Sequence, residues 1–390
     1  MSNRYTEVTR TSWFSRLGGA FKGILTGIIL FLVAFPLLFW NEGRAVATYQ
    51  ALLEGAGIVR SVEVDRVNPA NEGALIHVRG QATTTETLTD PTFGVSVNAL
   101  RLARKVEMFQ WQEQSETRTT INVGGSETRE TVYTYTQGWS EQRIDSSRFN
   151  QPQYQNPPSM PYSSQRFTAQ QATLGAFSLS SGTVERISGF APLPSDAVPD
   201  VPETLIGRAV QTEHGYYIGF NPHSPQIGDV RISFEQVQPT LISLIARQSG
   251  HSFEAYRTSN NRELFMLYTG SRSAEQMFEQ AQADNVTLTW LLRALGLFLM
   301  MTGIGMILKP ISVLLDVLPF LGRISRGMMS LVGLLIALPL TLVTIAIAWL
   351  FYRPLLAVVL LTAAVAVGFA AVALLRRLRK RSDDAPAAVV

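Results

Sequence analysis

The sequence contains no cysteine and little charge. Of its 390 residues only 16% are charged, whereas a soluble domain usually carries about 25%. The missing cysteine excludes disulfide frameworks, cysteine-ligated zinc, iron–sulfur clusters and thiol nucleophiles. Apolar residues, in contrast, make up 46% of the chain and gather in long runs. This composition is typical of an integral membrane protein.

The charge is distributed unevenly along the chain. Residues 41–287 contain 19 Lys and Arg against 26 Asp and Glu, and the remaining residues contain 14 against 4. The basic excess therefore lies beside the apolar runs and not on a polar domain. That position argues against a nucleic-acid partner and favours a lipid membrane.

Four apolar runs are long enough to cross a bilayer, which takes about 17–25 helical residues. The sequence predicts an α+β membrane protein with one N-terminal and three C-terminal transmembrane helices, and a large β-rich non-cytosolic domain. The predicted segments are a cytosolic N-terminal segment 1–22, helix 23–40, a β-rich lumenal or periplasmic domain 41–287, helix 288–308, a cytosolic or interfacial loop 309–327, helix 328–351, helix 355–375 and a basic cytosolic tail 376–390.

Basic residues mark the predicted cytosolic side. They precede the first span, and they outnumber the single acid, Asp316, in the loop 309–327. They also begin the C-terminal tail, as Arg376, Arg377, Arg379, Lys380 and Arg381. By the positive-inside rule both termini lie in the cytosol and residues 41–287 lie opposite. The basic tail is interpreted as a topogenic anchor, and binding to anionic lipid is compatible with that role.

Two features of the spans have competing interpretations. Ala45-Val46-Ala47 has the form of a signal-peptide cleavage site, but the preceding apolar run is longer than a signal core and Glu42 and Arg44 crowd the site. A retained anchor is therefore preferred. Arg293 lies just inside the second span, where a charge suggests function. Snorkelling of its guanidinium to the headgroups is the preferred interpretation.

The region between the first two spans shows the alternation of β-strands. Residues 73–80 form one predicted strand, and residues 106–113 and 131–136 form a hairpin across Asn122–Ser126, whose two glycines allow positive φ. In this hairpin we expect the face with Phe109 and Trp111 to be buried. Residues 229–234 and 241–246 form a second predicted pair. A capping box at Ser273–Gln276 begins a helix that leads into the second span.

No segment carries a specific catalytic signal. The histidines are scattered, and although His214, His223 and Asp229 could meet at a metal, ordinary polar roles are preferred. Glu107 and Glu113 share one strand face, which is better explained by a solvated sheet than by a glycosidase pair. The sequence therefore predicts neither an enzyme nor a cofactor.

Several short motifs resemble the transmembrane protein 43 family, also called LUMA, in the same order along nearly the whole chain. Asn41, Glu42, Gly43 and Arg44 directly follow the first span, Glu107 and Trp111 belong to the motif 106–111, and Asp229 and Arg231 belong to the motif 228–234. Arg353 and Pro354 belong to the last motif, 349–355. The further matching motifs are Asn71–Gly73, Asp90–Pro91, Phe93–Val95, Tyr133–Tyr135, Ser180–Gly182 and Ala246–Gln248.

The resemblance implies four spans, a large lumenal domain and cytosolic termini. It also implies, for eukaryotic members, residence in the endoplasmic reticulum and inner nuclear membrane, self-association, and complexes with lamin- and emerin-type partners. The family offers no catalytic residues to transfer. The absence of cysteine and the Arg-rich tail suggest a bacterial source, for which the location becomes the inner membrane and lamin binding does not apply.

The favoured function is a membrane scaffold that self-associates and organises other membrane proteins. The alternative is a ligand or ion sensor, or a transporter, with an extracytosolic sensing domain. Small residues in the spans favour close helix packing and a homo-oligomer, with packing inside one monomer as the competing explanation. The candidate packing residues are Gly296, Gly303, Gly305 and Ala364.

Overall fold

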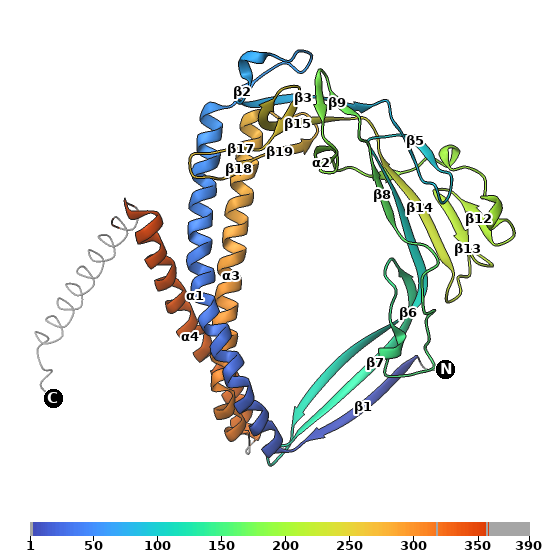
Figure 1. Ribbon diagram of the computed structural model, residues 1–390. Coiled ribbons are helices and arrows are strands. Elements are labelled where there is room, and N and C mark those ends of the chain that lie inside the picture. Colours follow the sequence, from blue (N-terminus) through green and yellow to red (C-terminus); the bar gives the residue numbers. More distant parts are fainter. Residues whose placement is uncertain (1–2, 317–318, 356–357, 359–390) are drawn as a thin grey trace, which may run out of the picture. The chain divides into compact units, whose positions relative to one another are not determined.

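The computed structural model describes residues 3–316, 319–355 and 358 (Figure 1). The chain divides into two compact units. Unit 1 comprises Met1–Thr11, Gln50–Ile121 and Glu127–Gln282, and unit 2 comprises Ser12–Tyr49, Asn122–Ser126 and Ala283–Val390. The expected fourth span 355–375, with Ala364, and the tail 376–390 lie outside the described residues, apart from Leu355 and Val358.

Unit 1 is rich in β-structure, as expected. Its strands are β1 Arg4–Thr11, β2 Arg60–Ser61, β3 Leu75–Thr84, β4 Thr87–Thr89, β5 Ser96–Asn98, β6 Arg101–Ile121, β7 Glu127–Ser140, β8 Gln165–Thr168, β9 Ala172–Leu174, β10 Phe177–Leu179, β11 Ala191–Pro192, β12 Ala209–Thr212, β13 Gly215–Ile218, β14 Val230–Val237, β15 Thr240–Ser249, β16 Ser252–Glu254, β17 Tyr256–Arg257, β18 Glu263–Leu264 and β19 Met266–Thr269. Its short helices are α2 Ser181–Val184, η1 Pro69–Asn71, η2 Ser146–Arg148, η3 Ser195–Ala197 and η4 Glu203–Leu205.

An eight-stranded sheet contains the predicted hairpin. Its order is β1-β7-β6-β14-β13-β12, with β8 beside β6 and β11 beside β14. β6 and β7 pair antiparallel from Met108↔Ser140 to Ile121↔Glu127. Gly124 and Gly125 adopt positive φ angles of 84° and 79° in the connecting turn, which confirms the reason for placing the turn there.

The buried face of this hairpin is the opposite of the expected one. Val106, Met108 and Gln110 are completely buried, whereas Phe109 and Trp111 are only half-buried. Side chains alternate along a strand, so only one face can meet the core. The core of this sheet lies on the side of Val106 and Met108, together with Phe234 of β14.

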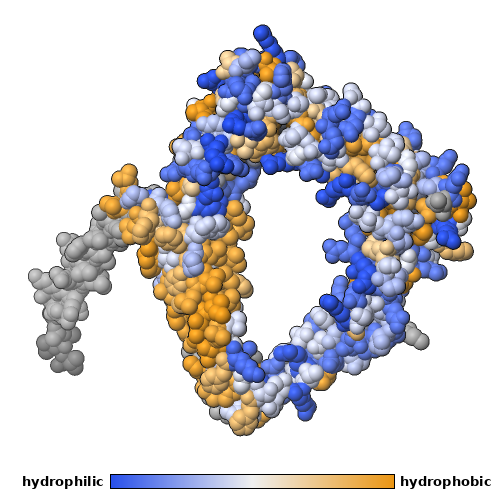
Figure 2. Space-filling view, viewed as in Figure 1, coloured by the Kyte–Doolittle hydropathy of each residue, from blue (hydrophilic) through white to orange (hydrophobic). Residues whose placement is uncertain are grey.

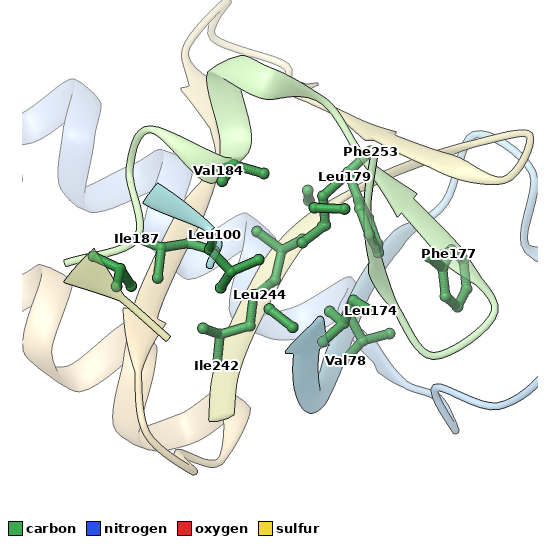
Figure 3. Close-up of a cluster of buried hydrophobic side chains, with 14 of the residues drawn as sticks. Val78, Leu100, Leu174, Phe177, Leu179, Val184, Ile187, Ile242, Leu244 and Phe253 are labelled. Atoms are coloured by element: carbon green, nitrogen blue, oxygen red, sulfur yellow. The ribbon is translucent and has the colours of Figure 1, made fainter. Parts of the chain in front are cut away.

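A seven-stranded sheet has the order β10-β9-β3-β15-β16, with β19 beside β15 and β2 beside β3. Its core gathers Val78, Leu174, Phe177 and Leu244, which point toward one another (Figure 3). The predicted strand 73–80 is confirmed as β3. The predicted pairing of 229–234 with 241–246 is wrong, because β14 pairs with β6 and β15 pairs with β3. Only Gln238 and Pro239 connect β14 to β15, and they pass the chain from one sheet to the other.

The described residues also contain three long helices: α1 Trp13–Ile58, α3 Ala274–Leu315 and α4 Pro319–Tyr352. In the part of the chain that is described, three helical stretches are long and apolar enough to cross a membrane, namely Trp13–Ile58, Ala274–Leu315 and Leu331–Tyr352. Figure 2 shows the apolar surface along α1 and α3, where Leu25, Ile29 and Leu32 are exposed. The fold is therefore α+β with three candidate spans; a fourth is not shown.

The helices extend beyond the predicted spans. The capping box is confirmed, because Ser273 Oγ accepts from Gln276 N at 3.2 Å and Gln276 Oε1 accepts from Ser273 N at 3.0 Å. α3 then continues without a break through the second predicted span. It also passes Lys309-Pro310, which we expected to end the helix, and reaches Leu315.

One strand pairing bears on membrane topology. Residues 4–11, expected in the cytosolic segment 1–22, form β1 and pair with β7 from Arg4↔Thr134 to Thr11↔Glu127. Two paired strands must lie on the same side of a bilayer, since the hydrocarbon region tolerates no open polar strand. The pairing and an α1 that crosses the bilayer once are therefore mutually exclusive in one chain.

Candidate functional site

The motif Asn41–Arg44 lies inside α1, and its acid is the centre of a buried ion pair. Glu42 is completely buried, and its carboxylate accepts from Arg293 Nε at 2.7 Å and Arg293 Nη2 at 2.9 Å. Trp349 Nε1 of α4 donates to the same carboxylate at 2.9 Å. The Arg293 guanidinium also lies over the Trp290 ring, 4.7 Å from its centroid. Glu42 thus joins all three long helices, and Arg293 is paired inside the chain instead of snorkelling.

A second polar layer involves the same turn of α1 as Glu42 and lies one to two turns before Arg293 on α3. Arg44 donates to Asn285 Oδ1 and to Thr289 Oγ1, both at 2.9 Å. Asn41 Nδ2 donates to the Thr289 carbonyl at 3.1 Å, and Asn285 Nδ2 donates to the Ala45 carbonyl at 3.0 Å. These contacts give buried amide and guanidinium groups the partners that they need away from water.

The remaining motif residues bring α4 against α1. A Cβ on Gly43 would lie 2.6 Å from Cζ of Tyr352, so the ring occupies the space that a side chain would fill. The Tyr352 ring also packs against Phe39, with centroids 5.3 Å apart. Arg353 N donates to the Trp349 carbonyl at 2.7 Å and Pro354 follows, so Arg353 and Pro354 stand where α4 ends.

A further ion pair lies near the other end of α1. Arg16 Nη2 donates to Asp316 Oδ2 at 2.6 Å, and Asp316 is almost completely buried. Trp13 Nε1 donates to the Val313 carbonyl at 2.8 Å. From Arg16 to Glu42, α1 rises about 39 Å at 1.5 Å per residue. A bilayer measures about 40–45 Å including its headgroups, so the two ion pairs are spaced to lie at its two interfaces. We call Glu42–Arg293 and Arg16–Asp316 the two clamps.

Between the clamps, α1 and α3 pack closely through glycines. A Cβ on Gly303 would lie 2.7 Å from the Gly27 carbonyl oxygen, and one on Gly296 would lie 2.5 Å from Leu38 Cδ2. A Cβ on Gly305 would meet no atom within 4 Å among the described residues. Gly296 and Gly303 therefore serve packing inside one chain, and only Gly305 leaves its face open.

The motif residues of unit 1 also bind one another. Arg231 lies opposite Glu107 in the ladder, with its Nη2 2.7 Å from Glu107 Oε2, and it covers the Trp139 ring at 4.7 Å. Asp229 accepts from the Tyr217 hydroxyl and from Gln226 N. Burial, and then the bond to Asp229, raise the pKa of Tyr217 above its usual value.

Trp111 is held through its backbone. Asn156 Oδ1 accepts from Trp111 N at 2.7 Å, and Asn156 Nδ2 donates to the Trp111 carbonyl at 2.9 Å. The Trp111 ring packs edge-on against Tyr154, with centroids 4.7 Å apart. The side chain of Asn156 therefore bonds the backbone of β6 as a neighbouring strand would. It holds the loop that contains Asn156 against the sheet.

Sequence reasoning missed the partners of these motifs. Asn285, Thr289 and Trp349 complete the site around Glu42, and Asp90 forms a buried ion pair with Arg104 at 2.7 Å. One sequence signal could have found the partners on α3: Asn285, Thr289 and Arg293 are polar residues spaced four apart, so they lie on one helix face. His214 Nδ1 is engaged at 3.0 Å with the Leu193 carbonyl, and Asp229 has the partners given above. In the described residues no cluster of three or more His, Asp or Glu side chains could hold a metal ion.

Long apolar helices joined by two buried ion pairs, with a β-rich unit in the same chain, define an integral membrane protein with several candidate spans. The chain belongs to the transmembrane protein 43 family, whose sequence model, described as Transmembrane protein 43, matches residues 108–354. No solved structure matches it.

Animal relatives match over most of their length. Transmembrane protein 43 of Rattus norvegicus is 34% identical over 369 residues, which cover 92% of this chain and 91% of the rat protein. The protein of Homo sapiens is 33% identical over 90% of each chain. The Transmembrane protein 43 homolog of Drosophila melanogaster is 30% identical over 87% of this chain and 91% of its own.

Proposed function

We propose that this protein is a multi-pass membrane scaffold that self-associates and organises other membrane proteins, and that it is not an enzyme. The observation that carries the proposal is the use of its motif residues. Glu42, Arg44, Glu107, Asp229 and Arg231 carry the charged groups of the motifs described above, and each of them is bound to a partner inside its own unit. These residues therefore stabilise the fold of the unit in which each of them lies.

The helical unit suits the role of a membrane base. The Glu42 clamp connects α1, α3 and α4, so the three helices stabilise one another. A transporter or ion sensor, the alternative function, needs a charged group that is available to a solute between its helices. Glu42 and Arg293 neutralise each other, which favours the scaffold.

The proposed orientation follows the positive-inside rule, with both termini and residues 309–327 in the cytosol and residues 41–287 opposite. α1 crosses the bilayer with α3, because the two helices contact each other antiparallel from one clamp to the other. The β1–β7 pairing can then form only in chains whose α1 has not been inserted. The proposed compartment is the inner membrane for a bacterial source and the endoplasmic reticulum or inner nuclear membrane for a eukaryotic one.

The proposed partners are a second copy of the chain and other membrane proteins. Lamin- and emerin-type partners belong to the proposal only for a eukaryotic source, as the family resemblance implies. Within the described part of the chain, no atom covers Gly305, and this face is the proposed contact for a neighbouring helix. Close approach of backbones at small residues is a main source of helix association in lipid.

Co-purification tests self-association directly. Two full-length copies with different affinity tags are expressed together, extracted in mild detergent and captured through one tag. We expect the second tag to be recovered, and not when separately extracted copies are mixed briefly. Crosslinking in native membranes before extraction identifies the other partners. A chain that is monomeric in mild detergent and yields no crosslinked species from membranes would contradict the scaffold proposal.

A further inference from the structure

Two neighbouring turns of unit 1 expose large apolar side chains at one edge of the eight-stranded sheet. Phe220 is 91% exposed, Ile206 is 69% exposed and Val210 is 46% exposed. Val210 lies on the edge strand β12, and the other two residues flank the β12–β13 hairpin. We call Ile206, Val210 and Phe220 the apolar edge, and it lies where Figure 2 shows apolar surface near β12 and β13.

The backbone holds these side chains outward. Arg208 N donates to the Leu205 carbonyl at 2.9 Å, closing a turn in which Ile206 has φ −56° and ψ 131° and Gly207 has φ +78°. Those angles define a type II turn, in which Ile206 occupies the tip. Leu205, directly before the tip, is buried in the core and anchors the turn.

The loop with Phe220 is fixed from both sides. Gly219 N donates to the Arg208 carbonyl at 3.3 Å, which brings this loop beside the Ile206 turn. The Tyr217 hydroxyl donates to the Asn221 carbonyl at 3.0 Å, and Gly219 packs directly on the Asp229 carboxylate. Phe220 therefore projects from a rigid support. Exposure of a phenyl ring to water is unfavourable, and burial of Phe220 against apolar groups would lower the free energy.

Three observations favour a lipid bilayer as the partner of the apolar edge. The exposed Arg208 lies between Ile206 and Val210, and among the described residues it makes no side-chain ion pair, so its guanidinium is available to a phosphate. β12 has only four residues, and so short an edge strand discourages pairing with a strand of another chain. Unit 1 is also continuous at both ends with candidate membrane spans, so a bilayer is always within tethered reach.

We propose that the apolar edge is a membrane-contact site, in which Ile206 and Phe220 enter the headgroup–acyl boundary of the lipid bilayer and Arg208 binds a lipid phosphate. Apolar side chains beside a basic residue are the composition that inserts at this boundary. The site would hold unit 1 against the membrane in addition to its covalent connections. It does not depend on the scaffold role proposed above.

The absence of cysteine allows a single probe to be placed. The full-length Ile206→Cys protein is labelled with an environment-sensitive fluorophore and reconstituted into phosphatidylcholine–phosphatidylglycerol vesicles. We expect the emission to shift to shorter wavelength and to be quenched by lipids that carry spin labels on their acyl chains. A label at Gln238→Cys, an exposed polar position, should show neither effect.

Further substitutions separate lipid contact from other causes. Phe220→Ser in the labelled protein should weaken the quenching, whereas Leu241→Ser, which removes an exposed apolar side chain of the other sheet, should leave it unchanged. Arg208→Gln should reduce the dependence on phosphatidylglycerol. Equal signals at positions 206 and 238 would overturn the proposal. A spectral shift that is lost on dilution with lipid, without quenching by acyl-chain labels, would also overturn it and would assign the edge to a second copy.

Discussion

Glu42 and Arg293 are the residues on which the packing of the long helices depends. Their ion pair is buried, and a buried pair is costly to break because the remaining charge has no partner. We expect Glu42→Leu and Arg293→Leu each to lower the free energy of unfolding by about 3–5 kcal/mol. Thermal unfolding of the full chain in detergent, followed by tryptophan fluorescence, measures the change.

The double variant distinguishes a clamp from two independent contacts. Replacing both charges by leucine removes the unpaired charge, so it should cost clearly less than the sum of the single substitutions. Trp349→Phe serves as a control, because it removes one hydrogen bond to Glu42 and leaves the pair intact. Additive losses in the double variant would mean that Glu42 and Arg293 do not act together.

His77 provides a pH-dependent contribution in unit 1. It is nearly completely buried, with Nδ1 3.1 Å from Ser61 Oγ and Nε2 3.0 Å from the Arg272 carbonyl. Burial lowers the pKa of His77 below its usual 6.5, against a smaller opposing effect of the Arg272 carbonyl. The unfolded state therefore binds the proton first. The contribution of His77 to stability is complete above pH 6.5 and is lost as the pH falls through the lowered pKa.

Melting temperatures between pH 5 and pH 8 test this contribution. The wild-type chain should lose stability toward the acid end of the range, and His77→Gln, which keeps a donor and an acceptor but does not titrate there, should lose less. His214→Gln is the matched control for the replacement of a histidine by glutamine, because the side chain of His214 is 41% exposed. An identical profile for wild type and His77→Gln would exclude His77 as the titrating group.

At the scale of elements, local signals predicted structure well and long-range signals did not. The β6–β7 hairpin and the N-terminal capping box of α3 depend on neighbouring residues, and both were predicted. The buried face of β6 was predicted wrongly, because Phe109 and Trp111 are the larger side chains but the core lies on the other side. The partners of Glu42 were missed because they come from residues about 250 and 300 positions away.

Gly303 and Gly305 give a paired test of helix packing. Gly303→Leu should destabilise the chain by at least the 1–3 kcal/mol typical of overpacking, because its side chain would meet the backbone of α1 at Gly27. Gly305→Leu should not lower the unfolding temperature, since a Cβ at this position meets no atom of the described residues within 4 Å. Both are measured by thermal unfolding in detergent.

The same two variants locate self-association. If Gly305→Leu dissociates the oligomer while the monomer remains folded, the open face of α3 is the contact between copies. Equal stability of Gly303→Leu and wild type would contradict the packing described for α1 and α3.

At the scale of the whole molecule, the location of residues 4–11 decides between two mutually exclusive arrangements. The basic residues before the first span and the apolar length of α1 favour a crossing α1, with residues 4–11 in the cytosol and β7 opposite. The β1–β7 ladder, and the hydrogen bond from the Arg16 guanidinium to the Gly125 carbonyl in the β6–β7 turn, require the same side. We expect the crossing arrangement, because apolar side chains such as Leu25, Ile29 and Leu32 need the hydrocarbon region.

Single cysteines report the side directly in this cysteine-free chain. Val8→Cys and Val123→Cys place exposed thiols in β1 and in the β6–β7 turn. In sealed vesicles of known orientation, a membrane-impermeant maleimide should label one of them at once and the other only after permeabilisation. Labelling of both from the same side would show that β1 remains paired with β7. In that case α1 does not cross the bilayer, and because α3 contacts α1 from one clamp to the other, α3 does not cross it either.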